Sequence, residues 1–405
     1  MKKLITFLSL CFVAALQAQD IKLSTKDNDL KLAALPYYSY GKGLGITSAD
    51  SLFQLNIRFR MQNRIGYIQN DGEDAAYDGQ IRRLRLRFDG YVGDPKFLYV
   101  IQLSFAPGDV GEIHDGENIN IIRDAAVIYR PSKHWSFTFG QTKIPGNRQR
   151  VNSSGALQLT DRSINNSRFN IDRDFGIQAY YLHEKKDKFS YNLKTAVTTG
   201  EGRNWTKSPD NGVAFTGKLE LFPFGSFKKD GTNFEGDLAR EEKPKLMLSG
   251  AAHQNNLARR TQGETGSDLY EQRTMSSLFG DAVLKYNGWA AMATYMKRMA
   301  KNPITVNPLD VTESNYVYVG EGMDYQLSYT FPSMYEIIGR YSYQNPHDDI
   351  KGLTPNTREY TIGVTKYIWE HAFKLQTEFT YDQLNYANGK TKDNWYVRFQ
   401  VEIGI

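Results

Sequence analysis

The fold of this chain is decided by one stretch, Gln80-Ile81-Arg82-Arg83-Leu84-Arg85-Leu86-Arg87-Phe88-Asp89-Gly90-Tyr91-Val92. From Arg83 onward, its hydrophobic and charged side chains fall on opposite parities. The hydrophobic parity holds Leu84, Leu86, Phe88 and Val92, and the charged parity holds Arg83, Arg85, Arg87 and Asp89. A strict period of two is typical of a β-strand whose two faces differ in chemistry. Alternation alone does not show which solvent meets which face, because soluble β-proteins also separate an apolar from a polar face.

The N-terminus has the parts of a secretory signal peptide. A short basic start, Met-Lys-Lys, is followed by an apolar run over residues 4–16 and by the small residue Ala18. This pattern predicts cleavage after about Ala18, so that residues 1–18 are a signal peptide. We expect residues 19–50, which show no clear period, to form an N-terminal segment in the periplasm or the lumen, ahead of a barrel spanning residues 51–405.

Composition excludes a helical membrane protein. Beyond the signal peptide the chain has no apolar run of the ~20 residues that a membrane helix requires, and its mean hydropathy is −0.54. A secreted soluble protein and an outer-membrane barrel both remain, since a barrel turns only alternate residues to lipid. Cys11 is the only cysteine; it makes a lipoprotein signal the alternative, but no small residue precedes it. Loss of Lys2 and Lys3 would lower the net charge from +5 to +3, so any functional positive charge must be local.

The alternation recurs in about sixteen segments. We expect strands at residues 53–64, 80–92, 97–105, 123–129, 135–139, 174–181, 189–199, 213–222, 245–253, 278–286, 289–297, 316–331, 334–343, 358–368, 372–384 and 394–405. Short and long connections alternate between them: Asn287-Gly288 is the dipeptide of a two-residue hairpin, whereas residues 142–171 form a long polar join. Short turns on one rim, long loops on the other and an even strand count are what an outer-membrane barrel requires.

The last strand fixes the orientation of the faces. Its alternation runs from Trp395 to the final residue, Ile405, so the chain closes a barrel with its end and leaves no free edge, which lipid would not tolerate. The apolar parity therefore faces outward and the arginines face the lumen. The polar segment at residues 223–243 has no place in this scheme.

Three motifs resemble the phosphate-selective porin O and P family. They are Arg82-Arg83-Leu84-Arg85-Leu86 with Asp89-Gly90, then Phe139-Gly140-Gln141-Thr142-Lys143-Ile144-Pro145-Gly146, then Arg173-Asp174-Phe175-Gly176-Ile177-Gln178. The resemblance implies a sixteen-stranded barrel, commonly trimeric, with a cationic lumen that passes anions and a third external loop folded into the pore, here residues 142–171. Residues 223–243 depart from the family, being long for a periplasmic turn, and so does Ile405, which replaces a terminal aromatic residue.

The inward arginines of the first two strands are the main site candidates. Arg58, Arg60, Arg83, Arg85 and Arg87 would form one basic stripe, and guanidinium offers a planar fork of donors to phosphate or carboxylate oxygens. The alternative is a structural wall, in which these arginines pair with lumenal carboxylates. The candidate carboxylates are Asp89, Glu220, Asp324, Glu378 and Glu402. Further candidates in or beside the long loop are Lys143, Arg148 and Arg150, with Arg162, Arg168 and Arg173 near them.

These features predict a water-filled, anion-preferring porin in the outer membrane of a Gram-negative bacterium. A weakly selective diffusion porin is the alternative, and a barrel enzyme or structural protein is a weaker one, because none of the six histidines pairs with a serine or a second histidine at catalytic spacing. Asp71, Asp74 and Asp78 do not have the spacing of an EF-hand, so we expect no metal and no cofactor. The expected partners are outer-membrane lipid, small anions such as phosphate and two further copies in a homotrimer, but no nucleic acid.

Overall fold

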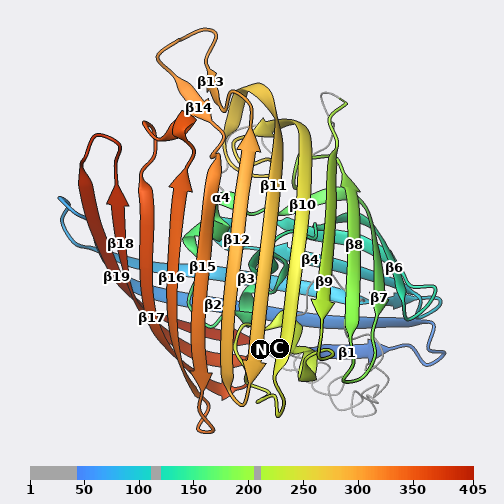
Figure 1. Ribbon diagram of the computed structural model, residues 1–405. Helices are drawn as coiled ribbons and strands as arrows, with labels where there is room; N and C mark the ends of the chain where they lie inside the picture. Colours follow the sequence, from blue (N-terminus) through green and yellow to red (C-terminus); the bar gives the residue numbers. More distant parts are fainter. Residues whose placement is uncertain (1–42, 111–119, 205–210) are drawn as a thin grey trace, which may run out of the picture.

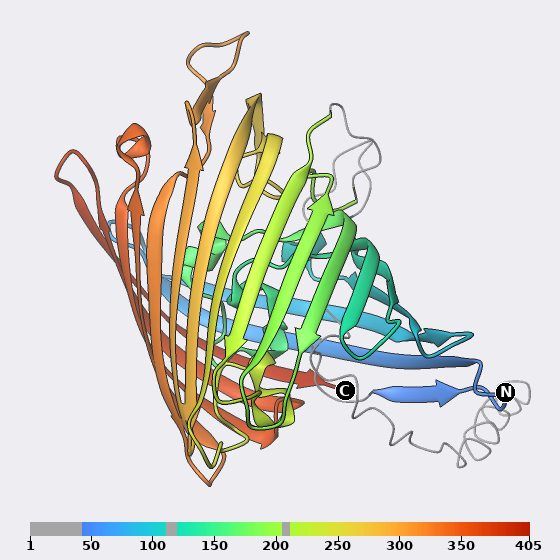
Figure 2. The ribbon, with the colours of Figure 1, turned by 45° about the vertical axis from the view of Figure 1, so that its right-hand side comes forward.

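The protein is a closed antiparallel β-barrel (Figures 1 and 2). The computed structural model describes residues 43–110, 120–204 and 211–405; the predicted signal peptide lies outside them. The barrel strands are β2 (Phe53–Gln69), β3 (Ala76–Val92), β4 (Phe97–Ser104), β5 (Ile122–Tyr129), β6 (Trp135–Lys143), β7 (Arg173–His183), β8 (Ser190–Thr198), β9 (Ala214–Phe222), β10 (Lys245–Arg260), β11 (Asp268–Tyr286), β12 (Trp289–Ala300), β15 (Gly320–Thr330), β16 (Tyr335–Pro346), β17 (Asn356–Trp369), β18 (Phe373–Asn385) and β19 (Thr391–Gly404). Each pairs with the next, and β19 pairs with β2 to close the cylinder, as predicted.

All sixteen predicted strands are present, and their ends differ most on the rim of long loops. β11 begins at Asp268 and β3 at Ala76, earlier than predicted. The strands continue there beyond the apolar band, where side chains no longer alternate in polarity although the backbone ladder goes on. The predicted start at Tyr316 is wrong, because Tyr316 pairs with Ile304 in a separate hairpin, β13 (Ile304–Val306) with β14 (Ser314–Tyr316). This hairpin stands at the top of Figure 1.

The apolar parity forms the outer surface. Ile101, Val127 and Ile362 are 42%, 54% and 59% exposed, whereas Arg83 and Arg87 are 2% and 4% exposed on the opposite face. The first set stands on the outside of the cylinder, and the second set faces the lumen, where polar neighbours are available. The predicted orientation of the faces is confirmed.

Arg82 departs from strict alternation. The register between β2 and β3 shifts after Gln62↔Arg83, where the next pair is Asn63↔Ile81. The bulge inserts Arg82 as an extra residue, which re-aims its side chain, and Arg82 binds the carboxylate of Asp161 together with Arg83. Period two alone would have placed this arginine outside the barrel.

The helices in the described parts of the connections are short. These are α2 (Pro107–Val110), α3 (Arg148–Val151), η3 (Ser154–Ala156), α4 (Ile164–Phe169), η4 (Lys228–Asn233) and η5 (Asp348–Ile350). Within the described ranges, no helix is long and apolar enough to cross a membrane. A further short strand, β1 (Leu44–Thr47), lies within the predicted N-terminal segment and extends the ladder on β2, pairing with Gln54 to Ile57.

Candidate functional site

The connection between β6 and β7, residues 144–172, contacts inward-facing side chains of strands far apart around the barrel; we call it the lumenal loop. Thr160 Oγ1 donates to Glu378 of β18 at 2.6 Å, and Asn165 Nδ2 donates to Asp324 of β15 at 2.7 Å. Gln376 of β18 donates to the carbonyl oxygen of Gln158 at 2.8 Å. Glu378 and Asp324, predicted as partners of wall arginines, instead hold this loop.

Two glycines of the wall make room for the loop. A Cβ at Gly322 of β15 would lie 2.0 Å from Asn165 Oδ1, and a Cβ at Gly363 of β17 would lie 2.4 Å from Leu159 Cδ2. Leu159 is 2% exposed in this position. The absence of a side chain on these strands therefore sets how closely the loop packs.

Gly322→Val is expected to loosen the lumenal loop, because the new side chain and Asn165 cannot occupy the same space. Overpacking of this kind costs about 1–3 kcal/mol, and limited proteolysis of the folded protein should show faster cleavage within residues 144–172. Gly339→Val is the matched control, since a Cβ there meets no atom within 4 Å. Equal cleavage of both variants would contradict this packing.

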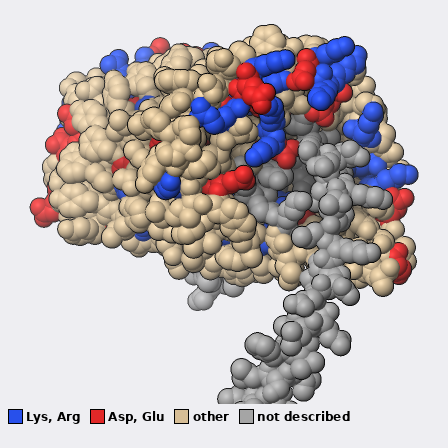
Figure 3. Space-filling view, turned by 90° about the horizontal axis from the view of Figure 1, so that it is seen from below, with Lys and Arg blue, Asp and Glu red and all other residues tan. Residues whose placement is uncertain are grey.

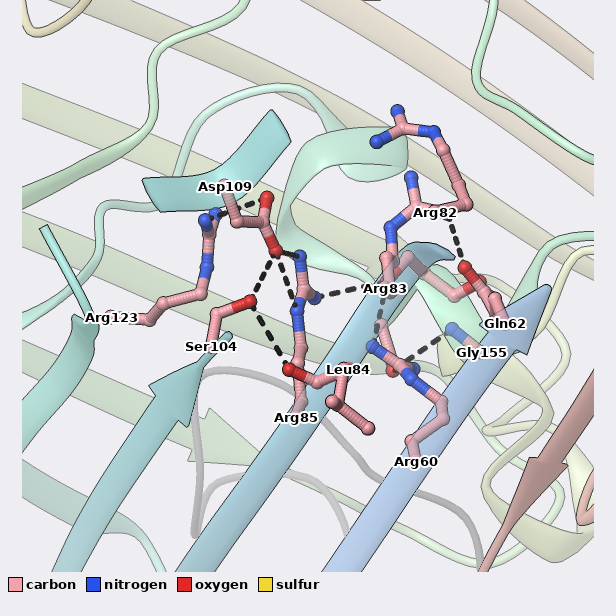
Figure 4. Close-up of polar contacts among 12 residues, drawn as sticks. Arg60, Gln62, Arg82, Arg83, Leu84, Arg85, Ser104, Asp109, Arg123 and Gly155 are labelled. Carbon is pink, nitrogen blue, oxygen red and sulfur yellow. Dashed lines mark hydrogen bonds and ion pairs between the residues drawn. The ribbon is translucent and has the colours of Figure 1, made fainter. Parts of the chain in front are cut away.

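The other side of the loop meets the arginine stripe of β2 and β3. Arg60 donates from Nη1 to Ser153 Oγ at 2.7 Å and from Nη2 to Ser154 Oγ at 2.8 Å. Arg85 reaches the same Ser154 hydroxyl at 3.1 Å. Gly155 is required beside them, because a Cβ there would lie 2.5 Å from Arg60 Nη1. Figure 4 shows Arg60 of β2 beside Gly155, with Arg85 on the neighbouring strand β3.

A cationic pocket lies between this wall and the loop. Its lining residues are Arg58, Phe59, Arg60, Arg85, Arg87, Gln102, Lys143, Ser153, Ser154 and Arg173. Six of these ten side chains are cationic, and none of the described residues that line the pocket is acidic. Charged groups, serine hydroxyls and the Gln102 amide provide hydrogen-bond donors, which is the chemistry of an anion site.

Carboxylates stand around the pocket and orient its cations. Asp89 pairs with Arg58 at 3.2 Å and with Arg87 at 2.9 Å, and Asp109 of α2 pairs with Arg85 at 2.6 Å and Arg123 at 2.9 Å. Burial alone would raise the pKa of Asp109, but the guanidinium groups of Arg85 and Arg123 outweigh it and hold that pKa far below its usual range. Asp109 is thus a permanent counter-charge that fixes the Arg85 side chain.

Asp161 ties the loop to the arginine stripe. Its carboxylate receives Arg64 at 2.7 Å, Arg82 at 2.8 Å and Arg83 at 3.1 Å. Burial would raise the pKa of Asp161, yet Arg83, Arg82 and Arg64 together hold it well below the usual range. One carboxylate therefore joins three guanidinium groups from two strands.

The structure brings together five of the eight predicted site residues. Arg58, Arg60, Arg85, Arg87 and Lys143 line the pocket. The other three lie elsewhere: Arg83 binds Gln62 and Asp161, Arg148 donates to the carbonyl oxygens of Thr232 and Phe234, and Arg150 pairs with Asp172 at 2.5 Å.

Sequence reasoning missed several members of the site. Arg173, noted only as lying beside the loop, lines the pocket and pairs with Asp124 at 2.9 Å. Ser153 and Ser154 carry no motif signal. Of the five carboxylates proposed as structural partners, Asp89 and Glu402 lie beside stripe arginines, whereas Glu220 pairs with Lys194 at 2.8 Å.

Solved structures of similar fold include an outer membrane channel and an outer membrane protein. The outer membrane channel DcaP of Acinetobacter baumannii is 13% identical, with 89% of this chain and 99% of that chain covered and a TM-score of 0.53. OmpF of Salmonella typhi, solved with daunomycin, is 14% identical, with 89% and 100% covered and a TM-score of 0.55. A loop L8 deletion mutant of OmpT from Vibrio cholerae is 13% identical, with 86% and 99% covered and a TM-score of 0.50. At this identity the similarity establishes the barrel fold.

The sequence itself places the chain in a family. No curated protein matches it significantly. The profile of the phosphate-selective porin O and P family, however, matches residues 53–402, which include every barrel strand from β2 to all but the end of β19. The chain therefore belongs to the phosphate-selective porin O and P family and is an outer-membrane porin.

Proposed function

We propose that this porin is a water-filled channel that prefers anions, with phosphate or related small anions as its solutes. The observation that carries the proposal is the cationic pocket, where six cations and two serine hydroxyls meet. Positive walls lower the energy of an anion inside a narrow lumen and raise its local concentration. Guanidinium forks also match the oxygens of phosphate better than a point charge does.

The carboxylates beside the pocket support passage rather than capture. Conduction needs an ion to bind well enough to enter and weakly enough to leave. Asp89 and Asp109 stand beside the pocket, and each pairs with two arginines. They therefore reduce the local positive charge without lining the pocket themselves. We infer that they keep the anion affinity moderate.

The remaining three predicted residues have positioning roles in this proposal. Arg83 holds Asp161, Arg150 holds Asp172, and Arg148 holds carbonyl groups deeper in the lumen. Together they keep the lumenal loop in place, so that the loop narrows the pore. They would then affect selectivity through the shape of the pocket.

Reversal potentials across a planar bilayer in a KCl gradient test the proposal. We expect chloride to permeate better than potassium, and addition of potassium phosphate to reduce the chloride current by competition for the pocket. Preference for potassium would overturn the anion channel. Nearly equal permeabilities would favour the weakly selective diffusion porin instead.

Acidification from pH 8 to pH 5 is expected to leave the anion preference at least as strong. The pKa of the Asp161 carboxyl is lower in the folded protein than in the unfolded chain, where it is about 3.9. Its ionised form therefore stabilises the fold fully above pH ~3.9, and this stabilisation is lost only as the pH falls toward the pKa of the folded protein. The loop thus stays attached, the arginines stay charged, and protonation of other carboxylates only adds positive charge. Reversal potentials at both pH values check this, and a loss of anion preference at pH 5 would contradict it.

We also propose, from the family resemblance, that the barrel assembles as a homotrimer in outer-membrane lipid. Light scattering of the detergent-solubilised protein, corrected for bound detergent, should give three times the mass of one chain. A mass of one chain would contradict the trimer.

A further inference from the structure

The connection between β9 and β10, residues 223–244, lies on the rim where other connections are tight turns; we call it the inner insertion. β9 ends at Phe222 and β10 begins at Lys245, as predicted, so the insertion leaves the strands intact. It is not a solvated loop: Phe234, Glu235 and Asp237 are 5%, 2% and 1% exposed. A segment this buried must be held by the barrel interior.

Lys285 of β11 is its principal anchor. The Lys285 ammonium group donates to the carbonyl oxygens of Gly231 at 2.7 Å, Phe234 at 2.9 Å and Gly236 at 2.7 Å. The Lys285 side chain is among the most buried of the described residues. All three donor positions of a buried cation are thus directed at backbone carbonyls of the insertion.

The insertion also meets the lumenal loop, which enters from the opposite rim. Arg148 of α3 donates to the carbonyl oxygens of Thr232, at 2.8 Å, and Phe234. The backbone N–H of Gln158, also in the lumenal loop, donates to the Glu235 carboxylate of the insertion at 3.0 Å. Two segments from opposite ends of the barrel therefore bind each other inside it.

The contacts of the inner insertion with the barrel wall lie on one side of the lumen. The insertion reaches β11 through Lys285, the β11–β12 turn through Asp237, which accepts from the Gly288 N–H at 2.8 Å, and β15 through Arg240, which donates to Thr330 at 2.6 Å. The cationic pocket instead draws its wall residues from β2, β3, β4, β6 and β7. The part of the barrel wall that the insertion covers, which we call the filled side, is thus different from the part that lines the cationic pocket.

The outer face of this rim carries charges of both signs where it is visible. Figure 3 looks onto it from below: where grey atoms do not cover the face, Lys and Arg side chains intermix with Asp and Glu in one region, and much of the rest is uncharged. The cluster of cations, with no carboxylate among its described lining residues, lies inside, at the pocket.

We propose that the inner insertion is the inner wall of the constriction: it closes the lumen over the β9–β17 side and confines solutes to the arginine-lined side. The inference rests on the proposed anion channel and deepens it. Lys285 is then a positioning residue, whose charge holds backbone carbonyls and does not attract solute. Selectivity would depend on this wall because an ion passing on the filled side would lie far from the arginines.

The variant Lys285→Met distinguishes a positioning role from a charge role, because the two predict opposite changes. If Lys285 were simply a lumenal cation, its loss would reduce the anion current. If it holds the insertion, its loss removes the hydrogen bonds that join three carbonyl groups of the insertion to β11. The insertion is then freed from that strand, so single-channel conductance should rise by about twofold with added current noise. Lys229→Met is the matched control, since this lysine of the same insertion is 74% exposed and pairs only loosely, at 3.7 Å, with Glu370.

Replacement of residues 224–243 by a short turn in the full chain is the stronger second test and covers failure of the point variant to fold. We expect conductance to rise by about twofold or more and the chloride-to-potassium permeability ratio to fall toward one. The control shortens the tip of the β13–β14 hairpin at residues 308–312, where Leu309 and Val311 are 95% and 81% exposed. That control should leave conductance unchanged.

The outcomes separate this inference from the proposed function. One outcome is that the unmodified channel prefers chloride while both insertion variants keep its conductance. That result would overturn the proposal that the insertion is an inner wall, and it would leave the proposed anion channel unaffected. An unmodified channel that prefers potassium would overturn the proposed function, whatever the insertion variants do. A fall in current in Lys285→Met would assign Lys285 to the conduction path and reject its positioning role.

Discussion

Replacing Arg60, Arg85 and Arg87 together by glutamine is expected to remove most of the anion preference. All three line the pocket, and a unit charge about 4 Å from a permeating ion changes its energy by about 1 kcal/mol even in water. Three charges, partly screened by salt, therefore change the relative permeability of anions and cations by about tenfold or more. Reversal potentials in a KCl gradient give that ratio directly.

These three arginines suit the test because no neighbouring carboxylate loses its last cation. Without Arg85, Asp109 keeps Arg123 at 2.9 Å; without Arg87, Asp89 keeps Arg58 at 3.2 Å. Without Arg60, Glu402 keeps Lys374 at 3.3 Å. The loss of charge is thus separated from the large cost of an unpaired buried carboxylate.

A matched control removes positive charge on the rims instead. Arg273 binds the exposed Glu271 on the long-loop side, and Lys366 donates to Ser333 on the short-turn side. Arg273→Gln with Lys366→Gln should leave the permeability ratio within about twofold of the parent, because these charges stand on the rims, outside the pocket, and salt screens charges over a Debye length of about 8–10 Å. Equal effects of both variant sets would show that the pocket is not the selectivity site.

The barrel was predictable from the sequence because lipid and water impose period two on every strand. Alternation such as that from Arg83 to Asp89 depends on local geometry alone, so it survives without any knowledge of neighbours. Strand ends were less predictable, as at Asp268 and Tyr316, because beyond the apolar band the two faces of a strand meet the same solvent. Hydrogen bonding between strands then decides the ends, and it leaves no pattern in a single strand.

The candidate site was predictable only where it lies on strands. Arg58, Arg60, Arg85 and Arg87 follow from parity, but Arg82 enters the lumen through a bulge, which one strand's sequence does not mark. The loop residues depend on long-range contacts. Arg148 was predicted to line the pore from the long loop, but it binds carbonyls of the inner insertion more than 80 residues further along the chain.

The carboxylates show the same limit. Asp109 and Asp161 come from connections, and nothing in their local sequence indicates that they pair with β3 arginines. The predicted choice between an anion-guiding stripe and a salt-bridged wall was therefore posed too simply. Arginines of the stripe form salt bridges with Asp89 and Asp109, which stand beside the pocket. The described side chains that line the pocket itself include six cations and no carboxylate.

Asp161→Asn is expected to give the largest loss of stability. The carboxylate is bound by Arg64, Arg82 and Arg83, and the side chains of Arg64 and Arg83 are only 5% and 3% exposed. Removing one partner of a buried ion pair typically costs about 3–5 kcal/mol, because the remaining charges stay desolvated. Asp161 is itself 22% exposed, so we expect about 3 kcal/mol, the lower end of that range.

Denaturant unfolding of the refolded barrel in detergent would measure this loss, and proteolysis would show whether residues 144–172 detach from the arginine wall. Asp71→Asn is the control, because Asp71 is exposed in the β2–β3 connection. Arg82→Gln added to Asp161→Asn should recover part of the stability, since it removes one of the uncompensated guanidinium groups. If Asp161→Asn behaved like Asp71→Asn, the three-arginine junction would not hold the lumenal loop, and the shape of the cationic pocket would have to be maintained by the other contacts of the loop, such as those of Ser153 and Ser154 with Arg60.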